Sequence, residues 1–341
     1  GAIEAVLSGA NTYTAHSGTK VLREAIAAKQ RRFTGMEVDP EGGIIVSAGA
    51  TGAMYCTFMA LLDPGDEVII FEPFYGYHVA TLRAVEAVPV FVPLQLPGWS
   101  FGMGLLEAAV TSRTKAILVN TPANPSGKVF TREELLLIAE FAGRHGLFVF
   151  TDEMYEHFVF DGREHLSIAT LPGMAGRTVT VSGLSKTFSV TGWRIGYALC
   201  DPKWAAAIGH FNDLVYVCAP APLQMGVAAG LLSLGDDYYF GLADEYGAKR
   251  DLFCGALAEA GLKPCVPEGA YYVLADVSHL PGDGARERAM HILRTTGVAA
   301  VPGSAFYHDG GGDSLVRFCF AKEEPVLAEA CERLLRLRPS L

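Results

Sequence analysis

Residues 181–197 read VSGLSKTFSVTGWRIGY and place Lys186 between two apolar runs of the chain. Small, hydroxyl and aromatic residues surround this lysine, and the next cation, Arg194, follows eight positions later. A lysine is most often a solvated surface cation, because burying an unpaired ammonium is costly. If Lys186 lies inside the protein, it therefore needs a chemical partner.

The composition predicts a large globular protein that does not bind nucleic acid. Half of the 341 residues are apolar and 19% are charged, which predicts a large core and two domains. The net charge is −10, and the longest basic cluster is the pair Arg31 and Arg32. Phosphate backbones require clustered cations, so a nucleic-acid partner is disfavoured. No run reaches the roughly 18 apolar residues of a membrane span, so we expect no membrane partner.

The seven cysteines are scattered and form no CxxC pair. Most have apolar neighbours, which is typical of reduced thiols and predicts neither a zinc site nor a disulfide framework. Without a signal peptide at its start, the chain is expected in the cytoplasm. It opens at Gly1 without an initiator methionine, on a pattern that resembles the middle of a helix, so we expect further residues upstream.

Seven short, nearly continuous apolar runs predict buried strands of one α/β sheet. They cover residues 44–48, 67–71, 88–94, 115–120, 147–152, 178–182 and 195–200. Such runs are typical of a mostly parallel sheet covered on both faces. Amphipathic helical patterns separate several of them, for example residues 131–146, which end at a glycine after a basic last turn.

The pattern changes at about Asp236, where a long charged helix is predicted. Three further strands, AYYVLAD (270–276), VAAVP (298–302) and LVRFCF (315–320), precede a last helix. We therefore expect two domains. Residues 1–235 would form the large domain, with seven strands sandwiched by helices, and residues 236–341 a smaller α+β domain.

Ligands of open α/β sheets bind beyond the carboxyl ends of the strands, so the residues that follow each strand are informative. A glycine turn and a helix start follow the first strand, and the amides of Ala50 and Thr51 there would suit a phosphate. Two other strands are followed by Tyr75 and Tyr77 and by Asn124, and the run 147–152 ends in Asp152 and is followed by Tyr155.

Each of these signals has an ordinary structural explanation. The glycine turn can simply reverse the chain, the tyrosines can belong to the core, and Asn124 can form a plain turn. Asp152 at the end of an apolar strand, however, needs a partner, as Lys186 does. One ligand, pyridoxal 5′-phosphate, would use every one of these groups. Its aldehyde forms a Schiff base with a lysine, and its ring nitrogen pairs with a carboxylate.

The sequence resembles the fold-type I, class I/II aminotransferases from about Tyr13 to Arg317. The most specific segment is SGLSKTFSVTGWRIGY (182–197), and further matches are NTPANPSG (120–127), TDEMY (151–155), GSAFY (303–307) and LVRFCFA (315–321). The resemblance implies that Lys186 is the Schiff-base lysine and the general acid/base. It also implies that Asp152 pairs with the pyridinium nitrogen.

The resemblance assigns further roles around the cofactor and the substrate. Tyr155 and Asn124 would hydrogen-bond the phenolic oxygen of the ring, and Tyr75 would stack on it. Arg317 would bind the substrate α-carboxylate, with Asn124 beside it. The phosphate would be bound by Ala50, Thr51, Ser185 and Arg194, and by Tyr13 of the neighbouring subunit of a homodimer.

Two features depart from the family pattern. Many members carry a serine where this chain has Gly183, so the preceding Ser182 receives no phosphate role. Only twelve residues precede Tyr13, whereas members usually have several tens, including a segment that lines the substrate pocket. We therefore expect either a longer protein or a pocket that closes differently.

The expected activity is ping-pong transfer of an α-amino group from an amino acid to a 2-oxo acid. A C–S β-lyase or synthase of the same fold would keep every residue named above, and an effector-sensing domain of a regulator is a further alternative. A nicotinamide-dependent dehydrogenase is disfavoured, because no glycine fingerprint follows the first strand. Tyr75 and Tyr77 favour aromatic or other apolar substrates, and no second cation for an acidic side chain is identified.

Overall fold

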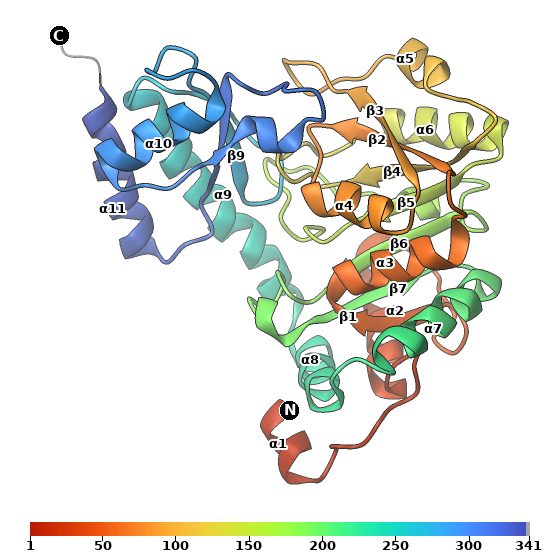
Figure 1. Ribbon diagram of the computed structural model, residues 1–341. Helices are drawn as coiled ribbons and strands as arrows, with labels where there is room; N and C mark the ends of the chain where they lie inside the picture. Colours follow the sequence, from red (N-terminus) through yellow and green to blue (C-terminus); the bar gives the residue numbers. More distant parts are fainter. Residues whose placement is uncertain (339–341) are drawn as a thin grey trace.

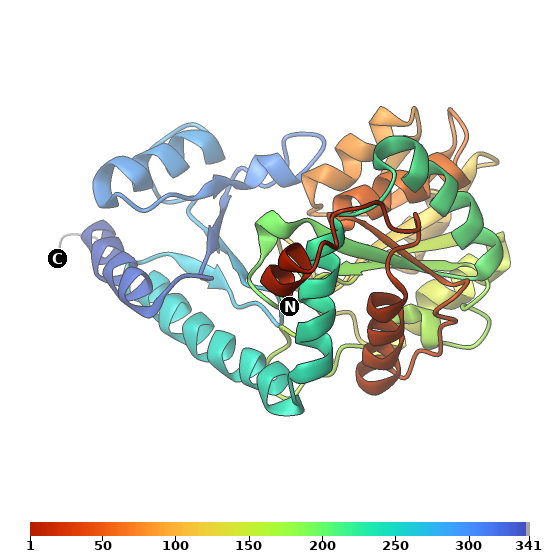
Figure 2. The ribbon, with the colours of Figure 1, turned by 90° about the horizontal axis from the view of Figure 1, so that it is seen from below.

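The computed structural model describes residues 1–338 and contains two separate sheets (Figure 1). The larger sheet has seven strands in the order β1-β7-β6-β5-β4-β2-β3, and the smaller has four in the order β10-β11-β9-β8. In Figures 1 and 2 the smaller sheet and its helices lie to one side of the larger sheet.

Every strand of the large sheet coincides with a predicted apolar run to within one residue at each end. The strands are β1 (Ile44–Ala48), β2 (Glu67–Glu72), β3 (Val88–Pro93), β4 (Thr114–Asn120), β5 (Phe148–Asp152), β6 (Thr178–Gly183) and β7 (Ile195–Leu199). β2 to β6 pair in parallel, whereas β7 is antiparallel to both of its neighbours, β6 and β1. The predicted mostly parallel sheet is confirmed.

Helices cover both faces of this sheet, because successive side chains of a buried strand point to opposite faces. Ile70 and Leu118 belong to the core that packs against α3 (Gly49–Leu61), α4 (Gly76–Ala84) and α7 (Pro202–Tyr216). Ile69 and Ile117 belong to the core on the opposite face. That face is covered by α5 (Met103–Ala108) and α6 (Arg132–His145), and beside them by α2 (Lys20–Thr34) and α8 (Ala221–Ser233).

The helix predicted at residues 131–146 shows how local sequence sets helix ends. The Thr131 side chain accepts a bond from the Glu134 amide, and the Glu134 carboxylate accepts one from the Thr131 amide. Gly146 ends the helix in the left-handed region, with φ 66°. The two predicted end residues are therefore the caps, and α6 itself spans Arg132–His145.

The smaller sheet is antiparallel and shares a core with the C-terminal helices and with residues 154–160, which follow β5. Its elements are α9 (Asp236–Glu259), β8 (Lys263–Cys265), β9 (Tyr272–Asp276), α10 (Ala285–Thr296), β10 (Val301–Pro302), η3 (Gly303–Phe306), β11 (Leu315–Cys319) and α11 (Glu324–Leu334). The strand β8 was not predicted from the sequence, because it has only three residues and is not fully buried. The run predicted at 298–302 is a strand only at its last two residues.

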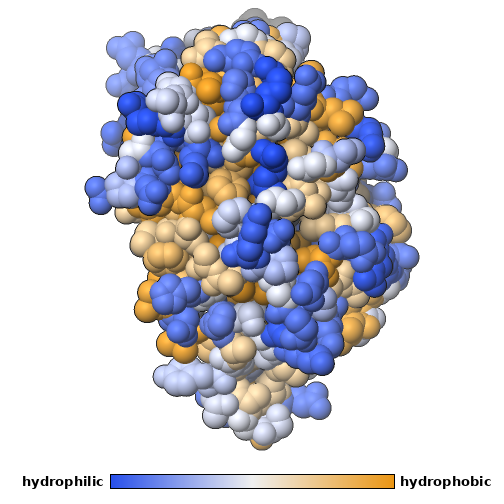
Figure 3. Space-filling view, turned by 90° about the vertical axis from the view of Figure 1, so that its right-hand side faces the viewer, coloured by the Kyte–Doolittle hydropathy of each residue, from blue (hydrophilic) through white to orange (hydrophobic). Residues whose placement is uncertain are grey.

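The surface of the described chain mixes polar and apolar side chains. Figure 3 shows hydrophilic and hydrophobic side chains interspersed over one face. Within residues 1–338, none of the helices has both the length and the apolar character required to cross a bilayer. The same residues contain no cluster of three metal-ligating side chains, and all seven cysteines are unpaired.

Candidate active site

A cavity of about 390 Å³ lies at one edge of the large sheet. The parallel strands end there, so the residues that follow β2, β4, β5 and β6 reach a common space. β7 runs in the opposite direction and begins at this edge. Arg194, the residue immediately before β7, is therefore brought to the same cavity.

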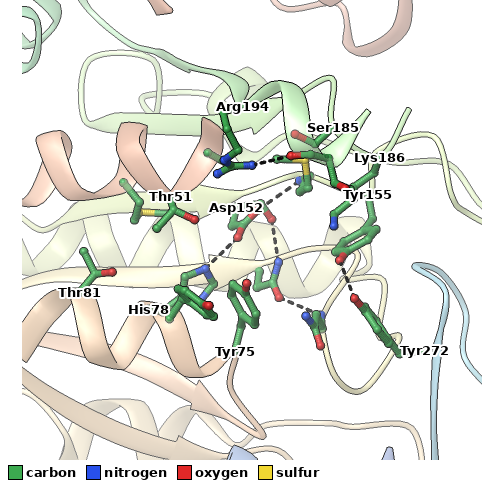
Figure 4. A pocket seen from close by; sticks show the side chains of 17 residues that line it. Thr51, Tyr75, His78, Thr81, Asp152, Tyr155, Ser185, Lys186, Arg194 and Tyr272 are labelled. Carbon is green, nitrogen blue, oxygen red and sulfur yellow. Dashed lines mark hydrogen bonds and ion pairs between the residues drawn. The ribbon is translucent and has the colours of Figure 1, made fainter. Parts of the chain in front are cut away.

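Nine of the residues predicted from the sequence line this cavity. They are Ala50, Thr51, Tyr75, Asn124, Asp152, Tyr155, Ser185, Lys186 and Arg194. Figure 4 shows Arg194 and Ser185 together at one side, Tyr75 at the opposite side, and Asp152 between them. Lys186 and Tyr155 approach from a third direction. Residues that are distant in the sequence thus surround one space.

Arg194 is packed closely against the turn that starts α3. Gly49 has φ +77°, and a Cβ built on it would lie 2.1 Å from Nη2 of Arg194. Gly196 is equally constrained, since its Cβ would lie 2.3 Å from the Ala50 nitrogen. Ala50 and Thr51 belong to the first turn of α3, whose free amides attract anions. The guanidinium and the helix start thus form one corner that suits an anion, which we call the anion corner.

The Ser185 hydroxyl completes this corner. Its oxygen is buried and has no hydrogen-bond partner within residues 1–338. Leaving a buried polar group unpaired costs about 1–3 kcal/mol, so such a group is expected to meet a ligand. Together with Arg194 and the amides of α3, the hydroxyl fits the oxygens of a phosphate group.

A buried carboxylate and imidazole form the floor of the cavity. Oδ2 of Asp152, the last residue of β5, lies 2.8 Å from Nε2 of His78 on α4, and both side chains are largely buried. Oδ1 of Asp152 accepts a bond from the Met154 amide at 3.2 Å. Asn120 Nδ2 donates to the main-chain oxygen of Asp152 at 3.0 Å. The carboxylate is therefore held in one orientation.

Lys186 lies half-buried on the loop after β6, so it is neither a free surface cation nor a fully enclosed one. Its amine is 5.8 Å from the centroid of the Tyr271 ring. Burial lowers the pKa of Lys186 below its ordinary value, and the positive charge of Arg194 lowers it further, while Cys319 and Asp152 oppose the shift. A lowered pKa increases the fraction of neutral, nucleophilic amine.

Two tyrosines border the cavity as protonated phenols. Burial, assisted by the neighbouring Tyr271 and Tyr272, raises the pKa of Tyr155 well above its ordinary value. The Tyr155 hydroxyl donates to that of Tyr272 at 3.4 Å. Burial and then the charge of Asp152 raise the pKa of Tyr75 to about 12. The Tyr75 ring stacks on Tyr77, with 5.2 Å between centroids.

Arg317, on β11 of the small sheet, lies beside the cavity rather than in its lining. Its Nη1 donates to Oδ1 of Asn124 at 2.8 Å, across 193 positions of sequence. The guanidinium carbon lies 4.3 Å from the centroid of the Tyr272 ring and 4.9 Å from that of Phe306. The Nε atom is buried and unpaired among the described residues, so the group can still donate to an anion.

Two residues discussed from the sequence lie away from the cavity. Tyr13 is 80% exposed and lies outside its lining, so this chain alone does not bring Tyr13 to its own site. Ser182 donates instead to the buried Glu156, at 2.7 Å. Glu156 in turn pairs with the buried Lys29, which anchors α2 to the large sheet.

Sequence reasoning missed several lining residues, notably His78, Asn120 and Tyr272. Asn120 is the last residue of β4, so the strand-end rule could have identified it. His78 follows Tyr75 by three positions, which is one helical turn, and this spacing was a usable signal. Tyr272 comes from the small sheet, and no local pattern points to the cavity.

Comparison with known proteins identifies the family. The family model for class I and II aminotransferases matches residues 3–334, nearly the whole chain. The chain belongs to this family. Membership implies pyridoxal phosphate as the cofactor and an amino acid and a 2-oxo acid as substrates. The anion corner, the buried Asp152 and the Lys186 amine provide the side chains that this cofactor requires.

The relatives of this aminotransferase carry different substrate names. It is 36% identical to mouse kynurenine–oxoglutarate transaminase 3, over 97% of this chain and 79% of the relative. The solved N-succinyldiaminopimelate aminotransferase of Mycobacterium tuberculosis superposes with a TM-score of 0.95 at 38% identity, covering 98% of this chain and 88% of that one. The solved structure of an Escherichia coli protein with methionine aminotransferase function superposes with a TM-score of 0.94 at 34% identity, covering 98% of this chain and 87% of that one. The family thus fixes the reaction type and leaves the substrate open.

Proposed function

We propose that this aminotransferase uses pyridoxal 5′-phosphate to move the α-amino group of an amino acid to a 2-oxo acid by a ping-pong mechanism. One observation carries the proposal. A single cavity joins a lysine amine of lowered pKa, a buried carboxylate and an anion corner with an unpaired hydroxyl. When bound, the cofactor supplies an aldehyde that combines with amines and a ring that accepts electrons from the substrate α-carbon.

Lys186 and Asp152 would carry the chemistry. The Lys186 amine would hold the cofactor covalently between turnovers and, once displaced by the substrate amine, move the proton at the substrate α-carbon. Its lowered pKa increases the fraction of neutral amine, which is the form that can accept this proton. Asp152 would face the ring nitrogen and keep it protonated, while His78 keeps the carboxylate oriented.

The remaining lining residues would orient the cofactor. Tyr155 would donate its hydroxyl to the phenolic oxygen of the ring in place of the long 3.4 Å bond to Tyr272. The side-chain oxygen of Asn124 accepts a bond from Arg317, so the side-chain nitrogen of Asn124 is free to donate to the phenolic oxygen of the ring. Tyr75 would cover the ring, and the corner formed by Ser185, Arg194 and the start of α3 would bind the phosphate.

The anion corner can be tested with a pair of glycine variants. In Gly49→Ala the new methyl group would collide with the Arg194 guanidinium, so we expect the affinity for pyridoxal 5′-phosphate to fall about 10- to 100-fold. Absorbance titration of the apoprotein measures this affinity. Gly65→Ala is the matched control, because Gly65 has a similar φ of +87° and no atom within 4 Å of the added Cβ. Equal affinities in the two variants would contradict the assignment.

Arg317 would bind the substrate α-carboxylate. Arg317→Gln keeps a polar side chain but removes the charge, so we expect the KM for amino acids to rise about 10- to 100-fold, with a smaller change in kcat. Steady-state kinetics separates the two parameters. Arg333→Gln, at another half-buried arginine on α11, is the control and should behave as wild type. An unchanged KM in Arg317→Gln would reject this role.

A donor panel tests the reaction itself and distinguishes transfer from β-elimination. We expect the amino group to appear on 2-oxoglutarate, with one 2-oxo acid formed per donor. Release of pyruvate and ammonia from an S-substituted cysteine, without transfer, would instead support the C–S lyase alternative. Tyr75, Tyr77 and Tyr272 line the cavity, and so we expect donors with aromatic or other apolar side chains to react fastest.

The assembly and compartment belong to the same proposal. The exposed Tyr13 would reach the phosphate of a neighbouring subunit, and the exposed Ile3 and Leu7 on α1 (Ala2–Leu7) are suited to burial against a second copy. A homodimer would then complete each site. A cytoplasmic location is supported by the seven unpaired cysteines.

A further inference from the structure

A buried carboxylate of the large sheet contacts the loop between η3 and β11, which precedes a strand of the small sheet. Glu72, at the end of β2, is 4% exposed. Its Oε1 accepts a bond from the main-chain amide of His308 at 2.8 Å and lies 2.9 Å from Nδ1 of the same histidine. The two residues are 236 positions apart. The carboxylate therefore fixes the loop after η3 on the large sheet.

Two more contacts fix residues 306–308, which we call the 306–308 segment. The Phe74 amide donates to the main-chain oxygen of Phe306 at 2.9 Å. The His308 ring stacks on Phe91 of β3, with centroids 4.3 Å apart and planes 9° from parallel. The segment is thus held by its backbone, by a carboxylate and by a stacked ring.

The 306–308 segment sets the position of the proposed substrate arginine. The Phe306 ring lies 4.9 Å from the guanidinium carbon of Arg317, and the Tyr272 ring lies 4.3 Å from it. Phe306 is buried, so it cannot move without the backbone that Glu72 and Phe74 hold. A displaced segment would therefore loosen the packing that orients Arg317.

We propose that Glu72 and His308 are positioning residues for recognition of the substrate α-carboxylate. Neither lines the cavity, and they would act by holding the 306–308 segment and, through Phe306, the guanidinium of Arg317. Holding a binding group in its bound geometry reduces the entropy that this group loses on binding. This inference rests on the proposed role of Arg317.

Binding of 3-phenylpropionate tests the inference, because this acid has a carboxylate but no amine to react. Calorimetry on the enzyme loaded with pyridoxal 5′-phosphate gives its affinity. We expect His308→Ala to weaken binding about 3- to 10-fold. His308→Asn can still donate near the Nδ1 position and should recover most of the affinity. The affinity for pyridoxal 5′-phosphate and the kcat of His308→Ala should stay within about twofold of wild type, since only carboxylate recognition is altered.

Two controls separate this inference from the role of Arg317. His210→Ala changes an exposed histidine on α7 and should bind 3-phenylpropionate as wild type does. If Arg317→Gln weakens binding and His308→Ala does not, the inference is wrong and the role of Arg317 stands. If wild type binds no more tightly than Arg317→Gln, the role of Arg317 is wrong, and the inference falls with it.

Discussion

Lys186→Ala is expected to lower the rate of amino-group transfer by at least about 10²- to 10⁴-fold, the usual contribution of a general acid/base. Lys186 carries the only amine among the residues that line the cavity, so no neighbour can replace it. The lost covalent link to the cofactor adds to the effect. Stopped-flow absorbance of the half-reaction with one amino acid measures the rate.

Mass spectrometry provides a second measurement that does not depend on activity. Borohydride reduction of the wild-type enzyme loaded with cofactor should add the cofactor mass to the peptide that contains Lys186, and Lys186→Ala should remain unmodified. Lys249→Ala, at another half-buried lysine outside the cavity, is the matched control and should be labelled like wild type. A label on a different lysine, or full activity of Lys186→Ala, would overturn the assignment.

Asp152→Asn is expected to reduce kcat by about 10²- to 10³-fold, with little change in KM. The substitution keeps the size of the side chain but removes the negative charge that would face the ring nitrogen. Because that charge would stabilise the protonated ring, its loss weakens electron withdrawal from the substrate. Steady-state kinetics and the pH dependence of the cofactor absorbance should both change.

The imidazole of His78, which contacts Asp152, provides a variant with a smaller expected effect on kcat. His78→Phe should reduce kcat by about 10-fold, because Asp152 keeps its charge and its bond to the Met154 amide but loses one hydrogen bond. Asp213→Asn, at an exposed position of α7, should have no effect. A loss in His78→Phe as large as in Asp152→Asn would show that the imidazole, rather than the carboxylate charge, is the decisive group.

The large sheet was predictable because its strands are buried on both faces. Such strands are continuous apolar runs, and the runs beginning at Ile44 and Glu67 have the predicted bounds to within one residue. The small sheet was less predictable. β8 is three residues long and incompletely buried, so its local sequence carries no strand signal. The division at residues 235 and 236 stays a prediction, although α9 begins at Asp236.

The candidate site likewise contains residues that could be located from the sequence and residues that could not. Asp152 and Asn124 could be located because Asp152 ends a parallel strand and Asn124 follows one, and parallel strands place their carboxyl ends at one edge. His78 was missed although it lies one helical turn beyond Tyr75. Arg194 immediately precedes β7, which is antiparallel to β6. Arg194 lies at the cavity because β7 begins at the edge where the parallel strands end. The motif resemblance, rather than strand geometry, had placed it there.

The sequence by itself determined the strands of the large sheet and the family, and it predicted Lys186 and Asp152 as site residues, because apolar periodicity and short motifs are local properties of the chain. Only the tertiary structure decided which partners these residues meet. The bonds from His78 to Asp152, from Arg317 to Asn124 and from His308 to Glu72 join segments 74 to 236 positions apart. The first contact depends on how α4 packs on the large sheet, and the other two depend on how the two sheets pack. Such packing is the sum of many weak interactions that no single stretch of sequence displays.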